Sequence, residues 1–367
     1  MKERLKAYSL QCLRGERRGL GARLWLAFLT PLSFAYSGGV VLRLGLYRRG
    51  WLPPRRLPCR VISVGNLVAG GTGKTPLVEV LARAMHRQGR RVVILLRGYR
   101  GRAEGPPTLV SDGSRIQGRP PWVGDEAYLL ARNLSGVPVI MGADRYQAGC
   151  FAVEEFGAED VLLDDGFQHL ALYRDLDILL IDGANPFGYG YLLPRGTLRE
   201  PVTSIGRAQV LIVTRADLAG ETGFLKQHLR SLNREAPILL ACHQPHSLQA
   251  VGGEETMGVE ALQGTAAMAF SGIADPASFE ATLTRLGTKI LKHLAFPDHY
   301  CFTQKDIEAI LEMGRDLKAE MILTTEKDAV RIPDFSMDQE IPIYALKIEF
   351  AFLEGQEALE QLLGLTL

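Results

Sequence analysis

The chain has 367 residues, which is enough for two domains that each bury a core of their own. Its 42 Lys and Arg residues balance 41 Asp and Glu residues to a formal net charge of +1, and this balance hides an asymmetry along the chain. The five cysteines are scattered and include no Cys-x-x-Cys pair, which argues against a zinc site and a disulfide framework and indicates a reducing compartment.

The N-terminal 60 residues carry the excess positive charge. They hold 13 Lys and Arg residues and two acidic residues, a net of +11, whereas the rest of the chain has a net of −10. A basic end on an otherwise acidic protein indicates contact with a polyanionic surface, either anionic lipid or nucleic acid.

Hydropathy favours lipid as that surface. Residues 24–42 form an uncharged run of 19 residues with arginines on both sides, a length that just crosses a bilayer core. The run contains Pro31 and Ser37-Gly38-Gly39, and arginines at both ends give no orientation, so a helix lying flat in the interface fits equally well. We expect residues 1–50 to associate with a membrane on its cytoplasmic side, with a buried core helix as the alternative. The apolar run starts too late for a cleaved signal peptide.

The segment VISVGNLVAGGTGKTPLVEVL at 61–81 predicts a strand, a glycine-rich loop and a helix in that order. This is the context of a phosphate-binding P-loop, in which backbone N–H groups and the positive end of the helix face the phosphates. The expected nucleotide-binding residues are Gly70, Gly71, Thr72, Gly73, Lys74 and Thr75.

Two side chains of this loop have specific expected roles. Lys74 is predicted to bridge the β- and γ-phosphates, and the Thr75 hydroxyl to ligate Mg²⁺. The usual pattern has its first glycine where Val68 stands in this chain. A glycine-rich turn without a ligand is the alternative, but Gly-Lys-Thr in the right place favours a nucleoside triphosphate site.

Beyond this loop, short apolar runs alternate with helical patterns, which predicts a parallel sheet covered on both faces. The predicted strands are 91–96, 138–141, 161–163, 178–181, 210–214 and 238–241, and the predicted helices are 125–134, 146–156 and 223–232. Further strands are expected at 266–273, 290–295, 321–324 and 343–348, with helices at 276–286, 304–317 and 357–363.

These patterns predict an α/β protein of two domains. The core domain, of P-loop NTPase type, is expected at 51–245, followed by a linker at 246–264 with low apolar periodicity. A smaller C-terminal α/β domain is expected at 265–367.

The predicted strand 161–163 ends in Asp164 and Asp165. In P-loop proteins a second strand beside the P-loop ends in an Asp that holds Mg²⁺, directly or through water. Asp-Gly also commonly forms a turn, so a purely structural turn is the alternative. The position of the pair after a P-loop favours the metal-binding interpretation.

Asp125 and His299 are ambiguous from residue type alone. Asp125 precedes a helical pattern, and its spacing favours a helix cap over the functional alternative, a base that orients and deprotonates an acceptor hydroxyl. His299 stands in the segment FPDHY, and a lone His is more often structural than catalytic. A cleft between two domains is nevertheless a place where a His can approach an Asp and increase its readiness to accept a proton.

Two polar segments follow predicted strands, RGYRGR at 97–102 and LPRGTLREP at 193–201. Parallel strands deliver their loops at the edge beside the P-loop, where a basic, glycine-containing loop suits a phosphorylated substrate. A solvated charge run explains the first segment equally well.

Taken together, these segments resemble the tetraacyldisaccharide 4′-kinase family, the lipid A 4′-kinases of Gram-negative envelope synthesis. The resemblance covers most of the chain and rests on the order and number of motifs. Ala127 and Leu96 depart from the residues usual in the family, Pro and Ser, and neither removes an assigned chemical group. The motifs are SVGNLVAGGTGKTP at 63–76, RGY at 97–99, GDE at 124–126, LLDDGFQH at 162–169, LPRGTLREP at 193–201, TRAD at 214–217, FPDHY at 296–300 and TTEKDAVR at 324–331.

The resemblance implies a reaction and its setting. In that family the γ-phosphoryl group of ATP passes to the 4′-hydroxyl of a tetraacylated glucosamine disaccharide 1-phosphate, with Mg²⁺ as the metal. The family is similar in fold to the P-loop kinases, with a smaller C-terminal α/β domain closing over the site. The implied location is the cytoplasmic face of the inner membrane, with the lipid substrate and the membrane surface as partners. No nucleic acid and no obligatory protein partner is expected.

Carried over to matching positions, the resemblance makes Asp125 the catalytic base, assisted by His299, with Lys74 on the phosphates. The remaining assignments are the metal ligands Thr75, Asp164 and Asp165 and the cleft residues Tyr99, Arg199 and Glu200.

Two other classes of protein stay open as alternatives. One is a membrane-associated P-loop GTPase acting as a switch, because Thr214-Arg215-Ala216-Asp217 is similar to a degenerate guanine-reading Asn-Lys-x-Asp motif. The other is a membrane-bound scaffolding ATPase that binds a partner protein. Neither accounts for the second α/β domain and FPDHY as well as the kinase does.

Overall fold

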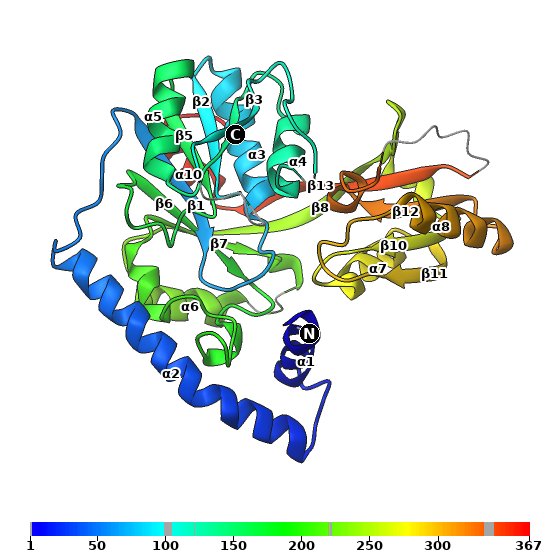
Figure 1. The fold of residues 1–367 in the computed structure, drawn as a ribbon, viewed down its shortest axis with the longest axis horizontal. Helices are drawn as coiled ribbons and strands as arrows, with labels where there is room; N and C mark the ends of the chain where they lie inside the picture. Colours follow the sequence, from blue (N-terminus) through cyan, green and yellow to red (C-terminus); the bar gives the residue numbers. More distant parts are fainter. Residues whose placement is uncertain (1, 99–104, 121, 219, 221, 334–340) are drawn as a thin grey trace. The chain divides into compact units, whose positions relative to one another are not determined.

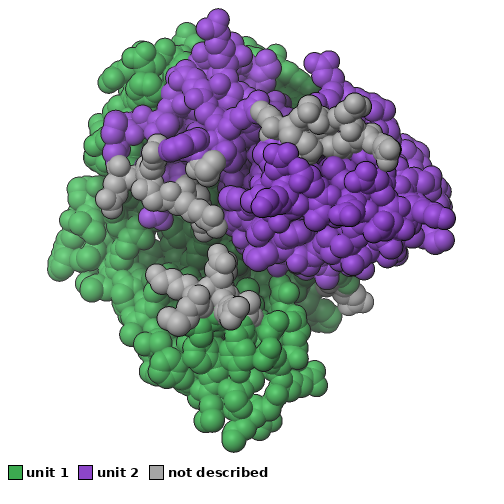
Figure 2. All heavy atoms as spheres, turned by 45° about the vertical axis from the view of Figure 1, so that its right-hand side comes forward, with its two compact units in different colours: residues 1–95, 144–242, 352–367 green, residues 96–143, 243–351 purple. Residues whose placement is uncertain are grey.

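The computed structural model describes the whole chain except residues 1, 99–104, 121, 219, 221 and 334–340. The chain packs into two compact units, drawn in green and purple in Figure 2. Unit 1 comprises residues 1–95, 144–242 and 352–367, and unit 2 comprises residues 96–143 and 243–351. Each unit takes residues from separate stretches of the chain, and the consecutive domain boundaries expected from the sequence stay a prediction.

Unit 1 is built on a parallel sheet whose central strand leads into the glycine-rich loop (Figure 1). Every residue of β5, β6 and β7 is buried, so helices and loops cover both faces of this sheet. Its strands, in spatial order, are the start of β8 (Ile238–Ala250), β7 (Val210–Thr214), β6 (Leu176–Asp182), β1 (Arg60–Asn66), β5 (Asp160–Asp164) and β2 (Val92–Leu96).

In unit 1, the two N-terminal helices precede the first strand, and the other helices stand between or after the strands along the chain. The helix after the glycine-rich loop, α3 (Lys74–Arg87), contacts β1 and β5. The other helices and single turns are α1 (Lys2–Leu13), α2 (Leu20–Arg48), α5 (Arg145–Phe156), α6 (Thr222–Leu232), α10 (Gln356–Leu363), η1 (Gly188–Gly190), η2 (Val202–Arg207) and η3 (Ala216–Leu218).

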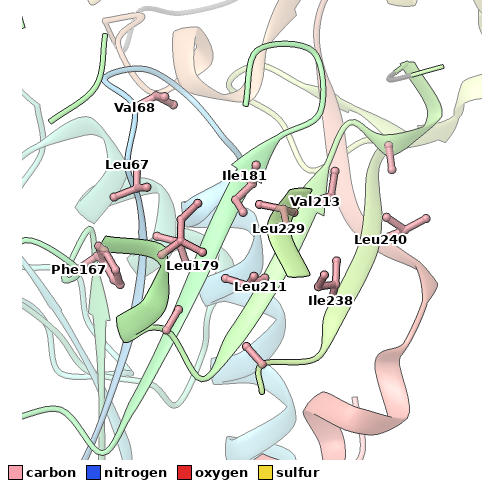
Figure 3. Close-up of a cluster of buried hydrophobic side chains, with 14 of the residues drawn as sticks. Leu67, Val68, Phe167, Leu179, Ile181, Leu211, Val213, Leu229, Ile238 and Leu240 are labelled. Atoms are coloured by element: carbon pink, nitrogen blue, oxygen red, sulfur yellow. The ribbon is translucent and has the colours of Figure 1, made fainter. Parts of the chain in front are cut away.

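A hydrophobic cluster in unit 1 supports the start of the glycine-rich loop. Leu67, Val68 and Phe167 belong to this cluster, which Figure 3 shows together with side chains from β6, β7, β8 and α6. Val68 is 7% exposed, and its backbone forms a bridge with Leu198. The valine that departs from the usual P-loop pattern therefore anchors the loop to the core, a packing role that glycine has no side chain to fill.

Unit 2 contains four parallel strands, with spatial order β11 (Lys289–Ala295), β10 (Ala266–Ser271), β12 (Met321–Thr325) and β13 (Ile343–Glu354). The antiparallel pair β3 (Thr108–Ser111) and β4 (Val139–Met141) also belongs to this unit and contacts α4. The parallel strands and the helices of both units confirm the predicted α/β fold. The helices of unit 2 are α4 (Asp125–Asn133), α7 (Pro276–Arg285), α8 (Gln304–Asp316), α9 (Glu326–Ala329) and η4 (Val259–Leu262).

The stretch 246–264, where we expected a linker, carries regular structure. Strand β8 continues to Ala250, and β9 (Thr256–Gly258) pairs with it in the antiparallel direction before η4 begins. Burial along the second half of β8 is mixed, which explains why the sequence showed little apolar periodicity there.

The predicted membrane segment forms one long helix, α2, drawn in blue in Figure 1. By length and composition it is apolar enough to cross a membrane, and 11% of its apolar window is buried. Its large apolar side chains are mostly exposed rather than packed, which disfavours the alternative of a buried core helix. The exposed ones are Leu20, Leu24, Phe28, Leu32, Phe34, Tyr36, Val41 and Leu42.

Replacing Gly65 in β1 by Ala should destabilise unit 1. An added Cβ would lie 2.5 Å from Cβ of Phe167 and 2.8 Å from its backbone nitrogen. Overpacking of this kind costs about 1–3 kcal/mol, so the thermal midpoint measured by circular dichroism should fall by several degrees. Gly223→Ala in α6 is the matched control, because a Cβ there meets nothing within 4 Å. Equal midpoints for the two variants would contradict the close packing of Phe167 on β1.

Candidate active site

The glycine-rich loop closes on itself through its own hydrogen bonds. Asn66, the last residue of β1, donates from Nδ2 to the Thr72 hydroxyl at 2.8 Å and to the Gly70 carbonyl at 3.4 Å. Gly73 caps α3 with φ of 84°, a left-handed conformation that other residues adopt only with strain. The backbone N–H groups at the start of α3 are thus presented as an anion site.

The pairing of β1 with β5 brings the first strand-end carboxylate to this loop. Val64 is in register with Asp164, and the Thr75 hydroxyl donates to Asp164 Oδ2 at 2.9 Å. Both side chains are oxygen donors of the kind that Mg²⁺ prefers, and Mg²⁺ in nucleotide sites takes few protein ligands besides phosphates and water. Within the described residues, no group of three or more His, Cys, Asp or Glu side chains is arranged to hold a metal ion. Thr75 and Asp164 therefore fit a nucleotide-bound Mg²⁺.

Asp165 is held by two cations. Its carboxylate lies 3.6 Å from Lys74 Nζ and 2.7 Å from Nη1 of Arg199. Burial alone would raise the pKa of Asp165, but the Lys74 ammonium and then the Arg199 guanidinium outweigh it and lower that pKa. Asp165 is therefore a carboxylate at neutral pH, and it forms an ion pair with Lys74, the lysine expected to contact phosphates.

The segment that carries Arg199 is tied by its backbone to the start of the glycine-rich loop. The Ala69 N–H donates to the Thr197 carbonyl at 2.6 Å, and the Arg199 N–H donates to the Leu67 carbonyl at 2.7 Å. These bonds place the Arg199 side chain beside Asp165. Glu200, expected in the cleft, is 2% exposed, and its carboxylate pairs with Arg207 at 2.7 Å.

The same segment is also held by the long helix α2. The Ser33 hydroxyl donates to the Leu192 carbonyl at 2.7 Å, and the Tyr36 hydroxyl donates to the Arg199 carbonyl at 3.1 Å. Arg195 donates back to the Leu26 carbonyl of the same helix at 3.0 Å. Helix α2 therefore contributes directly to the support of the phosphate loop.

In unit 2, Asp125 and His299 come together although 174 positions separate them. Asp125 Oδ2 lies 3.0 Å from His299 Nδ1. The N-cap of α4 is Gly124, and no side chain caps that end, so the helix-cap interpretation of Asp125 is not the arrangement found. The carboxylate at the first turn of α4 is instead directed to a histidine and an arginine.

The arginine is Arg331, which follows α9 and was not singled out from the sequence. Its Nε donates to Asp125 Oδ2 at 2.7 Å. Burial alone would raise the pKa of Asp125, but the hydrogen bond from His299 and the charge of Arg331 outweigh it and lower that pKa. The sequence signal was the TTEKDAVR motif, which contains this arginine but says nothing of its partner 206 positions away.

A second hydrogen-bonded chain in unit 2 joins Ser271, His293 and Glu280. Ser271 Oγ lies 2.9 Å from His293 Nε2, and His293 Nδ1 lies 2.8 Å from Glu280 Oε2. The order matches a Ser–His–acid triad. Ser271 has no exposed surface, so its hydroxyl has no access to a substrate and the chain is structural.

The predicted site residues thus form two clusters, one in each unit. Tyr99 lies outside the described residues. The cluster in unit 1 comprises Gly70, Gly71, Thr72, Gly73, Lys74, Thr75, Asp164, Asp165 and Arg199, and the cluster in unit 2 comprises Asp125 and His299.

Known proteins match this chain over nearly its whole length. The model of the tetraacyldisaccharide-1-P 4′-kinase family matches residues 25–366. The chain belongs to this family. The tetraacyldisaccharide 4′-kinase of Syntrophus aciditrophicus is 43% identical over 312 residues, 83% of each chain, and that of Pelobacter propionicus is 42% identical over 338 residues, 90% of each. The crystal structure of LpxK from Aquifex aeolicus in complex with ATP is 33% identical with a TM-score of 0.75, covering 93% of this chain and 98% of that one.

Membership of the tetraacyldisaccharide-1-P 4′-kinase family confirms the resemblance inferred from the motifs. The motifs that carried it are spread through both units, with the glycine-rich loop and LLDDGFQH in unit 1 and GDE, FPDHY and TTEKDAVR in unit 2.

Acid should destabilise unit 1 of this kinase-family protein through His169. Burial first, and then the charges of Arg145 and Arg174, lower the pKa of His169 from 6.5 to about 4. Between these values the unfolded chain binds the proton and the folded chain does not, so the free energy of unfolding falls as pH drops. The linkage relation limits the loss to about 3 kcal/mol, and partial exposure of the ring reduces it.

The measurement is the thermal midpoint at about pH 7 and about pH 5, in the window where the two states differ in protonation. His169→Gln should lose less stability on acidification than the unsubstituted protein. His86→Gln removes an exposed histidine from α3 of the same unit and serves as the control. If the thermal midpoint of His169→Gln falls on acidification by as much as that of the control, His169 is not the source of the acid sensitivity.

Proposed function

We propose that this protein is a tetraacyldisaccharide 4′-kinase, which transfers the γ-phosphoryl group of ATP to the 4′-hydroxyl of tetraacyldisaccharide 1-phosphate in lipid A biosynthesis. The observation that carries the proposal is the phosphate loop with Lys74 and Thr75 beside Asp164 and Asp165, in a chain that matches the family over residues 25–366. The ATP-bound LpxK structure supports ATP as the donor.

The residues of unit 1 bind and orient the donor. The N–H groups at the start of α3 and the Lys74 ammonium neutralise charge on the transferring group, which phosphoryl transfer needs more than covalent chemistry. Thr75 and Asp164, with Asp165, are the residues that would hold Mg²⁺, which when bound supplies further positive charge at the phosphates. Arg199 and Lys74 keep Asp165 ionised, as a metal ligand must be.

Residues of unit 2 orient and deprotonate the acceptor hydroxyl. Asp125 orients the 4′-hydroxyl and receives its proton late in the transfer, and His299 supports the carboxylate through its Nδ1 contact. A base with a lowered pKa suits a loose transition state, because most bond cleavage to the leaving group precedes proton loss from the hydroxyl.

The long apolar helix brings this site to its lipid substrate. The exposed apolar side chains of α2 insert into the membrane at the cytoplasmic face of the inner membrane, and the flanking arginines bind lipid phosphates. The sugar headgroup can then reach the site while the acyl chains stay in the bilayer. The partners are the lipid substrate and the membrane surface, without nucleic acid or an obligatory protein partner.

The test is transfer of labelled γ-phosphate from ATP to tetraacyldisaccharide 1-phosphate in detergent micelles. Label should appear in the lipid only when the acceptor and Mg²⁺ are both present. Asp125→Asn should lower turnover by about 10² to 10⁴-fold with little change in ATP affinity, because it removes a base but no phosphate contact. Lys74→Ala should weaken both ATP binding and turnover.

The control separates the kinase from a membrane-associated GTPase or scaffolding ATPase. The same preparations are assayed for phosphate released to water, with ATP and with GTP. Equal release with and without the lipid acceptor, and no label in the lipid, would contradict the kinase function and favour a switch or scaffold.

The membrane role of α2 predicts a separate result. The double substitution Leu24→Asp with Phe28→Asp places two charges on exposed apolar positions, 61% and 60% exposed, so folding should be unaffected. Binding to vesicles containing phosphatidylglycerol, measured by co-sedimentation, should weaken by at least about tenfold. The two apolar side chains no longer insert, and the new aspartates are repelled by the anionic lipid.

The matched control is Phe224→Asp on α6, a position that is 77% exposed on the same unit. It should leave vesicle binding unchanged. Equal binding by the α2 variant and the control would assign membrane association to another part of the chain.

A further inference from the structure

Arg331 joins the Asp125 carboxylate to three other groups of unit 2. Its side chain is 2% exposed, and Nε donates to Asp125 Oδ2 at 2.7 Å. Its Nη1 donates at 3.0 Å to both the Gly272 carbonyl and Asp328 Oδ1. Its Nη2 lies 3.2 Å from His299 Nδ1. One planar guanidinium therefore contacts both members of the Asp125–His299 pair, the Gly272 carbonyl and the Asp328 carboxylate.

We propose that Arg331 is a positioning residue for phosphoryl transfer, which holds Asp125 by Oδ2 so that Oδ1 is the oxygen presented to the acceptor hydroxyl. This inference rests on the proposed kinase function, in which Asp125 receives the acceptor proton. The hydrogen bonds that the described residues make to this carboxylate, from His299 and Arg331, both fall on Oδ2. Two donors on one oxygen fix the rotation of the carboxylate as well as its position.

Arg331 is suited to orienting a base because it takes no part in proton transfer. A guanidinium stays protonated in proteins and presents its donors in a rigid plane. Nε and Nη2 lie on the edge that meets Asp125 and His299, while Nη1 is held by Gly272 and Asp328. A lysine has one flexible ammonium and lacks the geometry to donate to Asp125, Gly272 and Asp328 together.

The local sequence fixes Asp328, which in turn holds Arg331. Thr325 caps α9, where its hydroxyl accepts from the Asp328 N–H at 3.1 Å and donates to Asp328 Oδ2 at 2.6 Å. The other carboxylate oxygen, Oδ1, takes Arg331 three residues later. Spacing of three residues places both side chains on one side of the turn.

The Gly272 carbonyl at the end of β10 fixes Arg331 and His299 together. It accepts from the His299 N–H at 3.0 Å as well as from Arg331. His299 has φ of 59°, a strained value for a residue with a side chain, and this shared carbonyl is one of the contacts that hold it. A Cβ on Gly272 would lie 3.0 Å from Asp328 Oδ1, a tight contact that favours glycine at this position.

A purely structural ion pair is the competing explanation, because a buried arginine also stabilises a fold when it satisfies buried acceptors. The two explanations differ in whether the effect of Arg331 on kcat depends on the Asp125 carboxylate. The charged groups around that carboxylate are His299 and Arg331, with Asp298 3.9 Å from His299 Nε2, Asp328 against Arg331, and the neighbouring pair Glu126–Lys327 at 3.7 Å. Removing the Arg331 cation removes the nearest charge that favours ionised Asp125.

The first experiment compares Arg331→Met and Arg331→Lys with the unsubstituted protein in the labelled-phosphate transfer assay. Arg331→Met should lower kcat on the order of 10² to 10³-fold, with less than about threefold change in KM for ATP, and should move the acid limb of the kcat–pH profile to higher pH. Arg331→Lys keeps a positive charge, so its acid limb should stay nearer that of the unsubstituted protein while kcat stays at least about tenfold low.

A double-mutant cycle tests whether Arg331 acts through Asp125. In the Asp125→Asn background, adding Arg331→Met should reduce kcat by no more than about twofold, because the group that Arg331 positions is already neutral. If Arg331 had a purely structural role, the fold-losses in kcat caused by the two substitutions would multiply. Lys305→Met, which removes an exposed cation from α8 of the same unit, is the matched control and should leave kcat and its pH profile unchanged.

Folding is checked by the thermal midpoint and ATP affinity of each variant, and Arg331→Lys carries the test if Arg331→Met does not fold. Unchanged kcat, an acid limb that does not move, or multiplying losses in the cycle would overturn the positioning role while leaving the kinase function intact. An unsubstituted protein that places no label in the lipid would instead overturn the proposed function.

Discussion

The parallel pairing of β1 with β5 is the constraint on which the phosphate site depends. β1 delivers the glycine-rich loop at its end, and the register of Val64 with Asp164 brings the first strand-end carboxylate within 2.9 Å of the Thr75 hydroxyl. Because both strands are buried on both faces, a slip in register would exchange the side chains that pack against the two covered faces of the sheet. The stability of the core therefore enforces the geometry of the site.

Each of the two clusters is built around a carboxylate that is kept charged while partly buried. Asp165 has Lys74 and Arg199 beside it, and Asp125 has His299 and Arg331. An isolated buried carboxylate would take up a proton, so these partners keep both carboxylates in the ionised form that the proposed roles need.

Helix α2 connects the expected membrane contact to this chemistry. Its apolar side chains are exposed, yet Ser33 and Tyr36 bond to the segment that carries Arg199. That segment is bonded in turn to the backbone of the phosphate loop at Leu67 and Ala69. A helix that only anchored the protein would not need polar contacts at these positions, so α2 also belongs to the framework of the nucleotide site.

The phosphate loop and the exposed apolar helix were predictable from sequence, because each depends on residues close together in the chain. The glycines and Lys74 shape their own turn, and an uncharged run of 19 residues needs no distant partner to be apolar. Asp125 was different, because spacing alone favoured a helix cap, and only the fold brought Arg331 to it across 206 positions. Glu200 was likewise assigned to a cleft from its motif, whereas the fold buries it with Arg207. Local patterns encode local hydrogen bonds, but the partner of a charged side chain is chosen by strand register and packing between distant segments.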